Sequence, residues 1–290
     1  MIHSLESLAS APAKEGRQAV ALSRFQAAHD SLACCQLCSH RCGANRLAGE
    51  TGPCHATTDA RVFMAQTEVS DELELIPVFA IALGGCDLRC SFCITGQDSW
   101  NVRSGKPMDV ESLAGKARTA IQQGARSIMI LGGEPTIHLP TVLRLVAALP
   151  GDAKLIWKTN AHGTQEARDL LAGLFDVWVA DYKFGNDVCA ERLARIPRYS
   201  QIVRENLLWA ATNTDLIIRH VLMPGHIDCC WAPVARWIAE NLPRTRINLR
   251  SGFWPAWQSG RHPELMLPLS PGEEKRARRL GTELGLQFTS

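Results

Sequence analysis

Three cysteines with short, regular gaps are the residues best placed to hold a metal cluster. Cys86, Cys90 and Cys93 are separated by three and then by two residues. Such gaps let one loop fold around a cluster and present several thiolates to it. Three thiolates can hold three corners of a [4Fe–4S] cube and leave the fourth iron open to a small chelating molecule. The alternative is a fourth cysteine ligand from elsewhere in the fold, with Cys229 and Cys230 as candidates.

A second group of cysteines lies closer to the N-terminus. Cys35, Cys38, Cys42 and Cys54 offer four thiolates within a short, Gly-rich stretch. Both iron and zinc are physically allowed there. The iron–sulfur site expected nearby favours an auxiliary [4Fe–4S] cluster over structural zinc. Cys34 competes with Cys35 as a ligand.

Polar residues also follow the strands that we expect, at the edge where the carboxyl ends of parallel strands meet. The polar residues are Glu134, Lys158, Asn160, Asp181, Lys183 and Arg219, and two glycines, Gly132 and Gly133, precede Glu134. The glycines allow close backbone approach, and the carboxylate of Glu134 can accept hydrogen bonds from an ammonium. Lys158 and Lys183 can pair with a carboxylate, while Asn160 and Asp181 can bind hydroxyls. This edge therefore suits a zwitterion, although turn residues, solvated lysines and an Asp181–Lys183 ion pair are the simpler interpretations.

Several residues have no single assignment. Cys229 and Cys230 are either buried structural thiols or a hydrogen-atom donor or extra ligand near the strand ends. Cys189 lies in an expected helix and is interpreted as structural. Arg219 either binds an anionic substrate group or pairs with an aspartate such as Asp181. These three sites, Arg219, Cys229 and Cys230, are the candidates for catalytic residues.

Short apolar runs rich in Val and Ile alternate with helical patterns and Gly or Pro breaks. The expected strands are 78–83, 127–131, 154–158, 176–180, 216–222 and 246–249. The expected helices are 17–32, 109–123, 139–149, 165–172, 189–195, 199–212, 232–241 and 271–284. This alternation predicts an α/β fold with a parallel sheet of right-handed βαβ units. A partial (β/α)6 TIM-like barrel and a flat doubly wound sheet are both compatible with it.

The pattern divides the chain into four parts. Residues 1–33 are expected to be a helical lead-in, and residues 34–60 a Cys-rich segment that cannot bury a core of its own and needs a staple. The barrel is expected over 75–250, followed by a C-terminal helical extension over 251–290.

Composition restricts the class of protein. The 290 residues include 31 Lys+Arg and 29 Asp+Glu, and a net charge of +2 indicates neither nucleic acid nor membrane as a partner. No apolar run approaches the ~20 residues that cross a bilayer, and the N-terminus lacks the pattern of a signal peptide. We therefore expect a cytoplasmic location. Eleven cysteines in a reducing compartment indicate metal binding or catalysis rather than disulfides.

Two motifs resemble those of the radical S-adenosylmethionine superfamily. They are GGCDLRCSFC over Gly84–Cys93 and LGGEP over Leu131–Pro135. The resemblance implies a partial barrel whose open iron binds the methionyl amine and carboxylate of S-adenosylmethionine. Reductive cleavage then gives a 5′-deoxyadenosyl radical that abstracts hydrogen from a substrate, with an electron donor of the flavodoxin or ferredoxin type.

A narrower resemblance, to the proteins related to pyruvate formate-lyase-activating enzyme, covers most of the chain. The segments that carry it are Cys35–Cys54, Asp181–Asp187, Ile218–Cys230 and Trp237–Pro243. By this resemblance Glu134 receives the methionyl amine, Lys183 the carboxylate, and Asp181 lies close to the adenosine or methionine moiety. Lys158 stands where activases commonly carry an Asp that helps to bind a monovalent cation, so its ammonium is hypothesised to replace that cation.

The leading hypothesis is thus a radical enzyme acting on an unidentified peptide or small molecule. The alternative within the class is an activase that installs a glycyl radical on a partner enzyme. The alternative from another class is a non-catalytic iron–sulfur electron-transfer protein. The polar strand ends argue against a carrier, because a carrier has no need of a zwitterion site.

Overall fold

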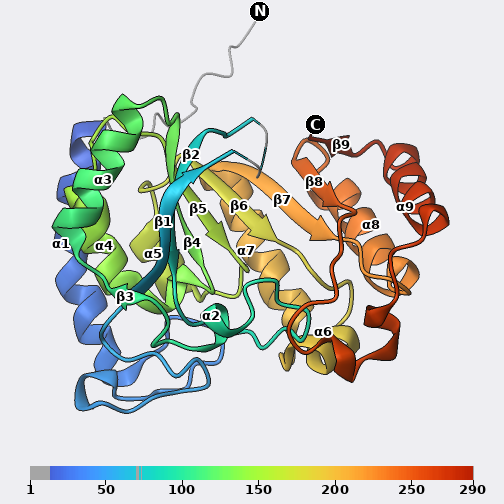
Figure 1. Cartoon of the computed structure of the whole chain (residues 1–290), viewed down its shortest axis with the longest axis horizontal. Coiled ribbons are helices and arrows are strands. Elements are labelled where there is room, and N and C mark those ends of the chain that lie inside the picture. The colour runs from blue at the N-terminus through green and yellow to red at the C-terminus, as the bar shows by residue number, and fades with distance from the viewer. Residues whose placement is uncertain (1–13, 70–71, 73, 290) are drawn as a thin grey trace, which may run out of the picture.

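The computed structural model describes residues 14–69, 72 and 74–289. In this part of the chain the strands form one sheet in the order β3-β1-β2-β4-β5-β6-β7-β8-β9 (Figure 1). The strands are β1 (Arg61–Glu68), β2 (Val78–Leu83), β3 (Lys106–Pro107), β4 (Ser127–Gly132), β5 (Leu155–Thr159), β6 (Val177–Asp181), β7 (Asp215–Val221), β8 (Arg246–Arg250) and β9 (Gln287–Phe288). From β2 to β9 neighbouring strands are parallel, whereas β1 is antiparallel to β2 and β3. The sheet is curved but not closed, which confirms the α/β partial barrel.

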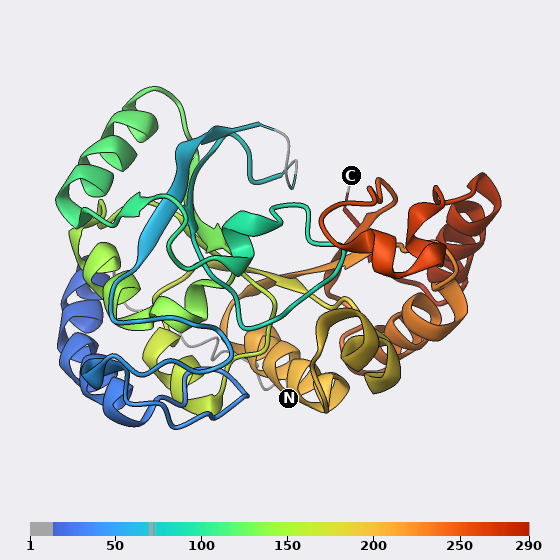
Figure 2. The same ribbon diagram turned by 60° about the horizontal axis from the view of Figure 1, so that its bottom comes forward.

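Helices cover the outer face of the sheet (Figures 1 and 2). They are α1 (Lys14–Asp30), α3 (Val110–Gln122), α4 (Leu139–Ala148), α5 (Gln165–Leu171), α6 (Asp187–Ala194), α7 (Tyr199–Asn213), α8 (Ala232–Asn241) and α9 (Pro271–Glu283). The short helix α2 (Gln97–Trp100) lies instead at the carboxyl end of β2, where the Gly85 amide donates to the Asp98 carbonyl. Short 3-10 turns span Ser31–Cys34, Arg46–Ala48, Pro135–His138, Ser259–Arg261 and Pro263–Met266, and a π-helical turn spans Ile227–Trp231. The six strands and the helices expected from the sequence are all present, with small shifts at their ends. The part of the expected lead-in over residues 1–13 lies outside the described residues, and the four-part division of the chain stays a prediction. None of the described helices is both long and apolar enough to span a membrane.

Alternation along the strands determines which side chains enter the barrel. Met129, Ile156, Val179 and Ile217 form one small buried cluster inside the sheet, while their strand neighbours pack outward under the helices. Because side chains two positions apart share a face, the residues that follow toward the carboxyl ends also point inward. The barrel is therefore apolar at the amino ends of its strands and polar at their carboxyl ends.

Three strands were not predicted. β1 pairs antiparallel with β2, and β3 and β9 are two-residue edge strands. Most β1 side chains are only half-buried. A strand in this position needs neither a continuous apolar run nor a regular alternation of apolar and polar residues, and the sequence 61–68 shows neither pattern.

Helix α1 is fastened to the barrel by one arginine. Arg17, which is buried, donates two hydrogen bonds of 2.8 and 2.9 Å to the carboxylate of Asp176 and one of 2.7 Å to the Ala153 carbonyl. A planar guanidinium matches a carboxylate in this two-pronged way. The lead-in helix is therefore held against the amino end of β6, next to α4.

Candidate functional site

The loop after β2 carries the three closely spaced cysteines. Cys86 and Cys90 are buried and Cys93 is partly buried. Backbone hydrogen bonds from Cys93 to Cys90 and from Gly96 to Cys93 fold the loop back on itself. Burial raises the pKa of Cys86 well above its ordinary value and that of Cys90 to about 12. Thiols of this kind keep their protons until a metal displaces them, so the donor set fits a cluster that takes thiolates.

The glycines at the end of β4 let this strand lie directly against the cysteine loop. A Cβ atom on Gly133 would lie 1.8 Å from the carbonyl oxygen of Gly85, and one on Gly132, whose φ is +145°, would lie 2.2 Å from that of Leu83. The amide of Glu134 donates a 2.9 Å hydrogen bond to Gly85. Any side chain at Gly132 or Gly133 would separate the two segments, so both glycines are required by this close approach.

Glu134 is a buried carboxylate surrounded by donors. Its Oε1 accepts hydrogen bonds from the Thr136 amide and hydroxyl, at 3.0 and 2.5 Å, and from the Thr159 hydroxyl at 2.9 Å. Its Oε2 accepts one bond of 2.7 Å, from the amide of Asn160. Burial and the charge of Asp87 raise the pKa of Glu134 to about 7, although these donors oppose the shift.

Asp87 joins the cysteine loop to the end of β5. Its carboxylate accepts a 2.7 Å hydrogen bond from the Asn160 amide group and contacts His162 Nδ1 at 2.7 Å. His40, from the Cys-rich segment, lies 3.0 Å from the Asp87 carbonyl oxygen. Burial by itself favours the neutral acid, but His162 and Asn160 hold the pKa of Asp87 below its usual range. Asp87 and His162 were not predicted from the sequence. The one feature that could have indicated them is their position, because Asp87 follows Cys86 and His162 lies two residues after Asn160.

Charged side chains fill the carboxyl end of the barrel interior. Glu72, whose side chain is fully buried, lies 3.7 Å from Lys158 Nζ and 3.2 Å from Arg219 Nε. Arg219 Nε lies 3.6 Å from Asp181, which also pairs with Lys183. Burial opposes ionisation of Asp181, yet Lys183, Arg219 and, at longer range, Lys158 hold its pKa below the usual value. The ion pairs of Asp181 with Lys183 and with Arg219 are both alternatives that the sequence had left open; Glu72 was not anticipated.

The Cys-rich segment packs on the loop between β5 and α5. Ser39 donates to the His162 carbonyl at 3.0 Å, and Thr164 donates to the Leu37 carbonyl at 3.2 Å. Figure 1 shows the segment, in blue, at the lower left, on the side toward which the arrows of β4 and β5 point. It therefore lies beside the loop of Asn160 and His162 that also contacts the first cysteine group.

The thiols of this segment differ in exposure. Cys35, Cys38 and Cys54 are buried, and Cys34 and Cys42 are exposed. Burial, followed by the charge of Asp87, raises the pKa of Cys38, and burial raises that of Cys54. Three of the four predicted ligands thus face the protein interior.

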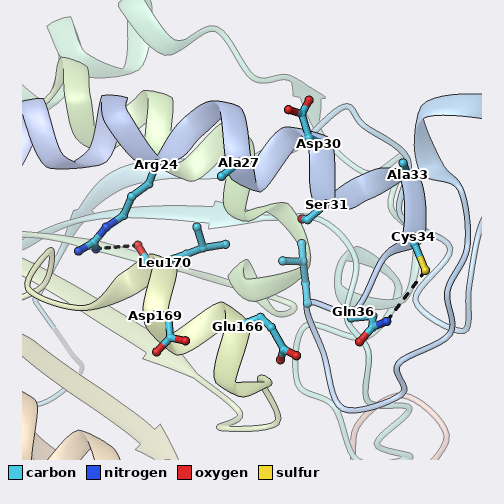
Figure 3. Close-up of a pocket in the computed structure, with 11 residues that line it drawn as sticks. Arg24, Ala27, Asp30, Ser31, Ala33, Cys34, Gln36, Glu166, Asp169 and Leu170 are labelled. Carbon is cyan, nitrogen blue, oxygen red and sulfur yellow. Dashed lines mark hydrogen bonds between the residues drawn. The ribbon is translucent and has the colours of Figure 1, made fainter.

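A surface pocket of about 530 Å³ lies between α1 and α5, away from this chemistry (Figure 3). Cys34, Glu166 and Asp169 are part of its lining, and Cys34 is within 4.0 Å of the Gln36 amide group. The polar residues at the strand ends do not line it. We therefore place the candidate site at the barrel interior and the cysteine loop.

The chain after β8 covers the cysteine loop from the other side. Gln258 donates a 2.8 Å hydrogen bond to the Ser91 carbonyl, and His262 lies 3.0 Å from the Ser91 hydroxyl. The rings of Trp257 and Trp100 are 5.5 Å apart. Trp257 therefore packs on α2, the helix that follows the cysteine loop.

Cys229 and Cys230 lie on the π-helical turn after β7. Their thiols contact His226, and that of Cys229 also contacts Cys189. These residues form a group of their own, which is taken up below.

His220 points away from the barrel interior, opposite to its neighbour Arg219. It is 1% exposed, and its Nδ1 lies 2.6 Å from the Tyr182 carbonyl oxygen. Burial lowers the pKa of His220 to about 4. A neutral ring therefore donates Nδ1–H to Tyr182.

We expect this histidine to make stability depend on pH. Its folded pKa lies below the unfolded value of about 6.5, so the unfolded state binds the extra proton and stability falls as pH decreases from 6.5 toward 4. The loss reaches about 2 kcal/mol at pH 5. In thermal unfolding at pH 7.5 and pH 5, His220→Asn should lose less stability on acidification than the native chain. The exposed His55→Asn is the control, and equal losses in all three proteins would contradict the prediction.

Residues 81–238 match the family model of the Radical SAM superfamily. This match covers more than half of the chain, and the chain belongs to that superfamily, whose members are enzymes. Membership implies a [4Fe–4S] cluster and S-adenosylmethionine as cofactors.

Individual proteins are also similar to this chain. Protein MJ0674 of Methanocaldococcus jannaschii is 28% identical over 264 residues, covering 88% of this chain and 76% of that protein. A 7-carboxy-7-deazaguanine synthase of Prochlorococcus marinus is 42% identical over only 60 residues, 21% of this chain and 26% of its own. Among solved structures, Streptococcus suis SuiB bound to the precursor peptide SuiA has a TM-score of 0.52 at 18% identity, covering 70% of this chain and 46% of SuiB. The chain thus spans less than half of SuiB, and this likeness concerns the fold.

Proposed function

We propose that the protein binds a [4Fe–4S] cluster through Cys86, Cys90 and Cys93 and reductively cleaves S-adenosylmethionine. When bound and reduced, the cluster supplies the electron that cleaves the cofactor to methionine and a 5′-deoxyadenosyl radical, which abstracts hydrogen from substrate. The observation that carries the proposal is the close approach of β4 to the cysteine loop at Gly85 and Gly133. It places three thiols and a buried carboxylate at one end of the barrel.

The strand-end residues would orient S-adenosylmethionine. Among the described residues, Oε2 of Glu134 accepts a hydrogen bond only from Asn160, so it retains a lone pair for an N–H of the methionyl amine. Lys183 lies close enough to Cys90 for its charge to oppose the rise of that thiol's pKa. This proximity supports a role for Lys183 in receiving the methionyl carboxylate, and Asp181, its ion-pair partner, would contact the adenosine or methionine moiety.

Lys158 would take the place of a bound monovalent cation near Asp181. In support, its charge helps to keep the pKa of Asp181 low, together with the direct contacts from Lys183 and Arg219. A requirement for Na⁺ or K⁺ in cofactor cleavage would contradict this role.

Cys35, Cys38, Cys42 and Cys54 would hold a second [4Fe–4S] cluster, with zinc as the alternative. Among the described residues, no three of these thiols lie within 4.8 Å of one another. This wider spacing suits a cluster better than a single zinc ion, because a cluster binds each cysteine through a different iron. An iron content near eight per chain after reconstitution supports two clusters, and a content near four contradicts the second.

The substrate that we propose is a peptide or a small molecule. SuiB, whose fold is similar, is described in complex with a precursor peptide. A protein substrate that acquires a glycyl radical is the other outcome, and a reductant of the flavodoxin or ferredoxin type would supply the electron.

Anaerobic reconstitution tests the proposal. The reduced cluster should give an electron paramagnetic resonance signal that changes when S-adenosylmethionine is added, because the cofactor binds directly to the open iron. Dithionite should then yield 5′-deoxyadenosine and methionine. The spectroscopic readout needs no substrate, so an unchanged signal together with no 5′-deoxyadenosine would contradict the function, whatever the substrate is.

A further inference from the structure

Four potential metal ligands converge outside the site described above. Cys189 lies on α6, and His226, Cys229 and Cys230 lie at the turn after β7. Their ligand atoms are all within 4.8 Å of one another. His226 Nδ1 is 3.7, 3.2 and 3.6 Å from the sulfurs of Cys189, Cys229 and Cys230. The sulfur of Cys229 is 3.8 Å from that of Cys189 and 3.9 Å from that of Cys230.

These separations match the edges of a tetrahedron around one ion. Zn–S bonds of about 2.3 Å and a Zn–N bond of about 2.0 Å give S–S edges of about 3.8 Å and S–N edges of about 3.5 Å. A [4Fe–4S] cluster binds each sulfur through a different iron, so its ligands are spread more widely. A disulfide would bring two sulfurs to about 2.05 Å, far closer than any pair here. The geometry therefore fits a mononuclear site.

Two loops are shaped to bring these ligands together. A Cβ atom on Gly185 would lie 2.3 Å from the Cys230 carbonyl oxygen, so only glycine allows the β6–α6 loop to approach the turn after β7. Asn186 then bridges them: its amide group donates to the Cys229 carbonyl at 2.6 Å and lies 3.3 Å from the Cys189 sulfur. Its oxygen also caps α6 by accepting from the Cys189 amide at 2.8 Å.

The far side of the histidine ring is equipped to support a metal ligand. With Nδ1 facing the three sulfurs, Nε2 of His226 lies 3.3 Å from the Arg192 guanidinium and 3.7 Å from Oε1 of Glu264. Glu264 is held in place by Arg192, at 2.5 Å. A ring that ligates through Nδ1 carries its proton on Nε2, and Glu264 is the acceptor for that proton. The Arg192 guanidinium can only donate, so its contact with Nε2 does not favour this tautomer.

We propose that Cys189, His226, Cys229 and Cys230 bind one Zn²⁺ ion. Three thiolates and one imidazole complete a tetrahedron without a water, which is typical of structural rather than catalytic zinc. The ion would fasten the β6–α6 loop, which follows Asp181 and Lys183, to the turn that follows Arg219. None of its four ligands belongs to the loop of Cys86, Cys90 and Cys93 or to the N-terminal cysteines.

Zinc analysis of the reconstituted full-length protein tests this site. After addition of equimolar Zn²⁺ and removal of loosely bound metal with a chelator, we expect about one zinc per chain, and X-ray absorption at the zinc edge should show three sulfurs at about 2.3 Å and one nitrogen at about 2.0 Å. This measurement sees zinc alone, so iron in the clusters does not interfere. A four-sulfur shell would place zinc at the N-terminal cysteines, and a shell of nitrogen and oxygen would indicate adventitious binding. Either result, or no retained zinc, overturns the proposal.

Substitutions then identify the ligands. Cys189→Ser and the double variant Cys229→Ser/Cys230→Ser should retain less than about one fifth of the zinc, because each removes ligands from a closed site. Cys34→Ser removes an exposed cysteine and is the matched control, with zinc unchanged. Iron content shows whether each variant has folded. Full zinc retention in both ligand variants would contradict the assignment, and if they do not fold, the native zinc spectrum decides alone.

Discussion

Replacing Cys90 with serine should abolish cleavage of S-adenosylmethionine. We expect the rate of 5′-deoxyadenosine formation to fall by at least about 10³-fold, which corresponds to roughly 4 kcal/mol of transition-state stabilisation. Cys90 is one of only three proposed ligands in its loop and is 6% exposed, so water cannot readily take its place. A serine hydroxyl is a far poorer ligand for iron than a thiolate. Chromatography of anaerobic reactions with dithionite measures the nucleoside directly.

The iron content separates loss of the cluster from loss of a catalytic group. In the Cys90→Ser variant it should fall by about four per chain, because one [4Fe–4S] cluster is lost while a second cluster would remain. Cys34→Ser is the control, since Cys34 is exposed and faces the pocket beside α1. Native amounts of 5′-deoxyadenosine from the Cys90 variant would exclude this cysteine as a required ligand.

The fold was predictable because the central strands are buried on both faces. β2 is buried along its whole length, and such continuous apolar runs between helical patterns indicate a parallel sheet. β1 was missed because it is half-buried and antiparallel, a placement decided by its partner strand β2. Neighbouring residues of β7 point to opposite faces of the sheet, so only one of Arg219 and His220 can face the interior, and it is Arg219.

The site was predictable only where its residues belong to a local motif. The cysteine spacing and the two glycines before Glu134 are such motifs. Glu72 enters the barrel from a part of the chain far from Lys158 and Arg219, and nothing in the local sequence around it indicates that pairing. The same holds for Cys189, which the sequence treated as structural and the fold brings to Cys229. Contacts between distant elements depend on the sheet order, which follows from packing and not from spacing.

Replacing Glu134 with glutamine should weaken the binding of S-adenosylmethionine by roughly 30- to 100-fold, about 2–3 kcal/mol. The side chain would lose its charge-assisted bond, in which the carboxylate accepts from the methionyl amine. The new amide would also place N–H groups against donors from Thr136 or Asn160, where the native oxygens accept. Anaerobic titration of the reconstituted, oxidised protein measures the affinity without turnover.

The dependence of that affinity on pH distinguishes a direct contact between Glu134 and the cofactor from a purely structural role of Glu134. The pKa of Glu134 is raised to about 7 by burial and Asp87, and the ionised carboxylate is a stronger acceptor for the methionyl amine than the neutral acid. Affinity in the native protein should therefore rise as pH increases from 6 to 7.5, whereas in the glutamine variant it should stay level over that range. Thr136→Val is the matched control: it removes the 2.5 Å hydroxyl donor to Oε1 and leaves Oε2 untouched, so it should cost about 1 kcal/mol of stability with little change in affinity. If Glu134→Gln binds the cofactor as tightly as the native protein, with the same pH dependence, Glu134 serves only to cap the Pro135–His138 turn and to hold Asn160.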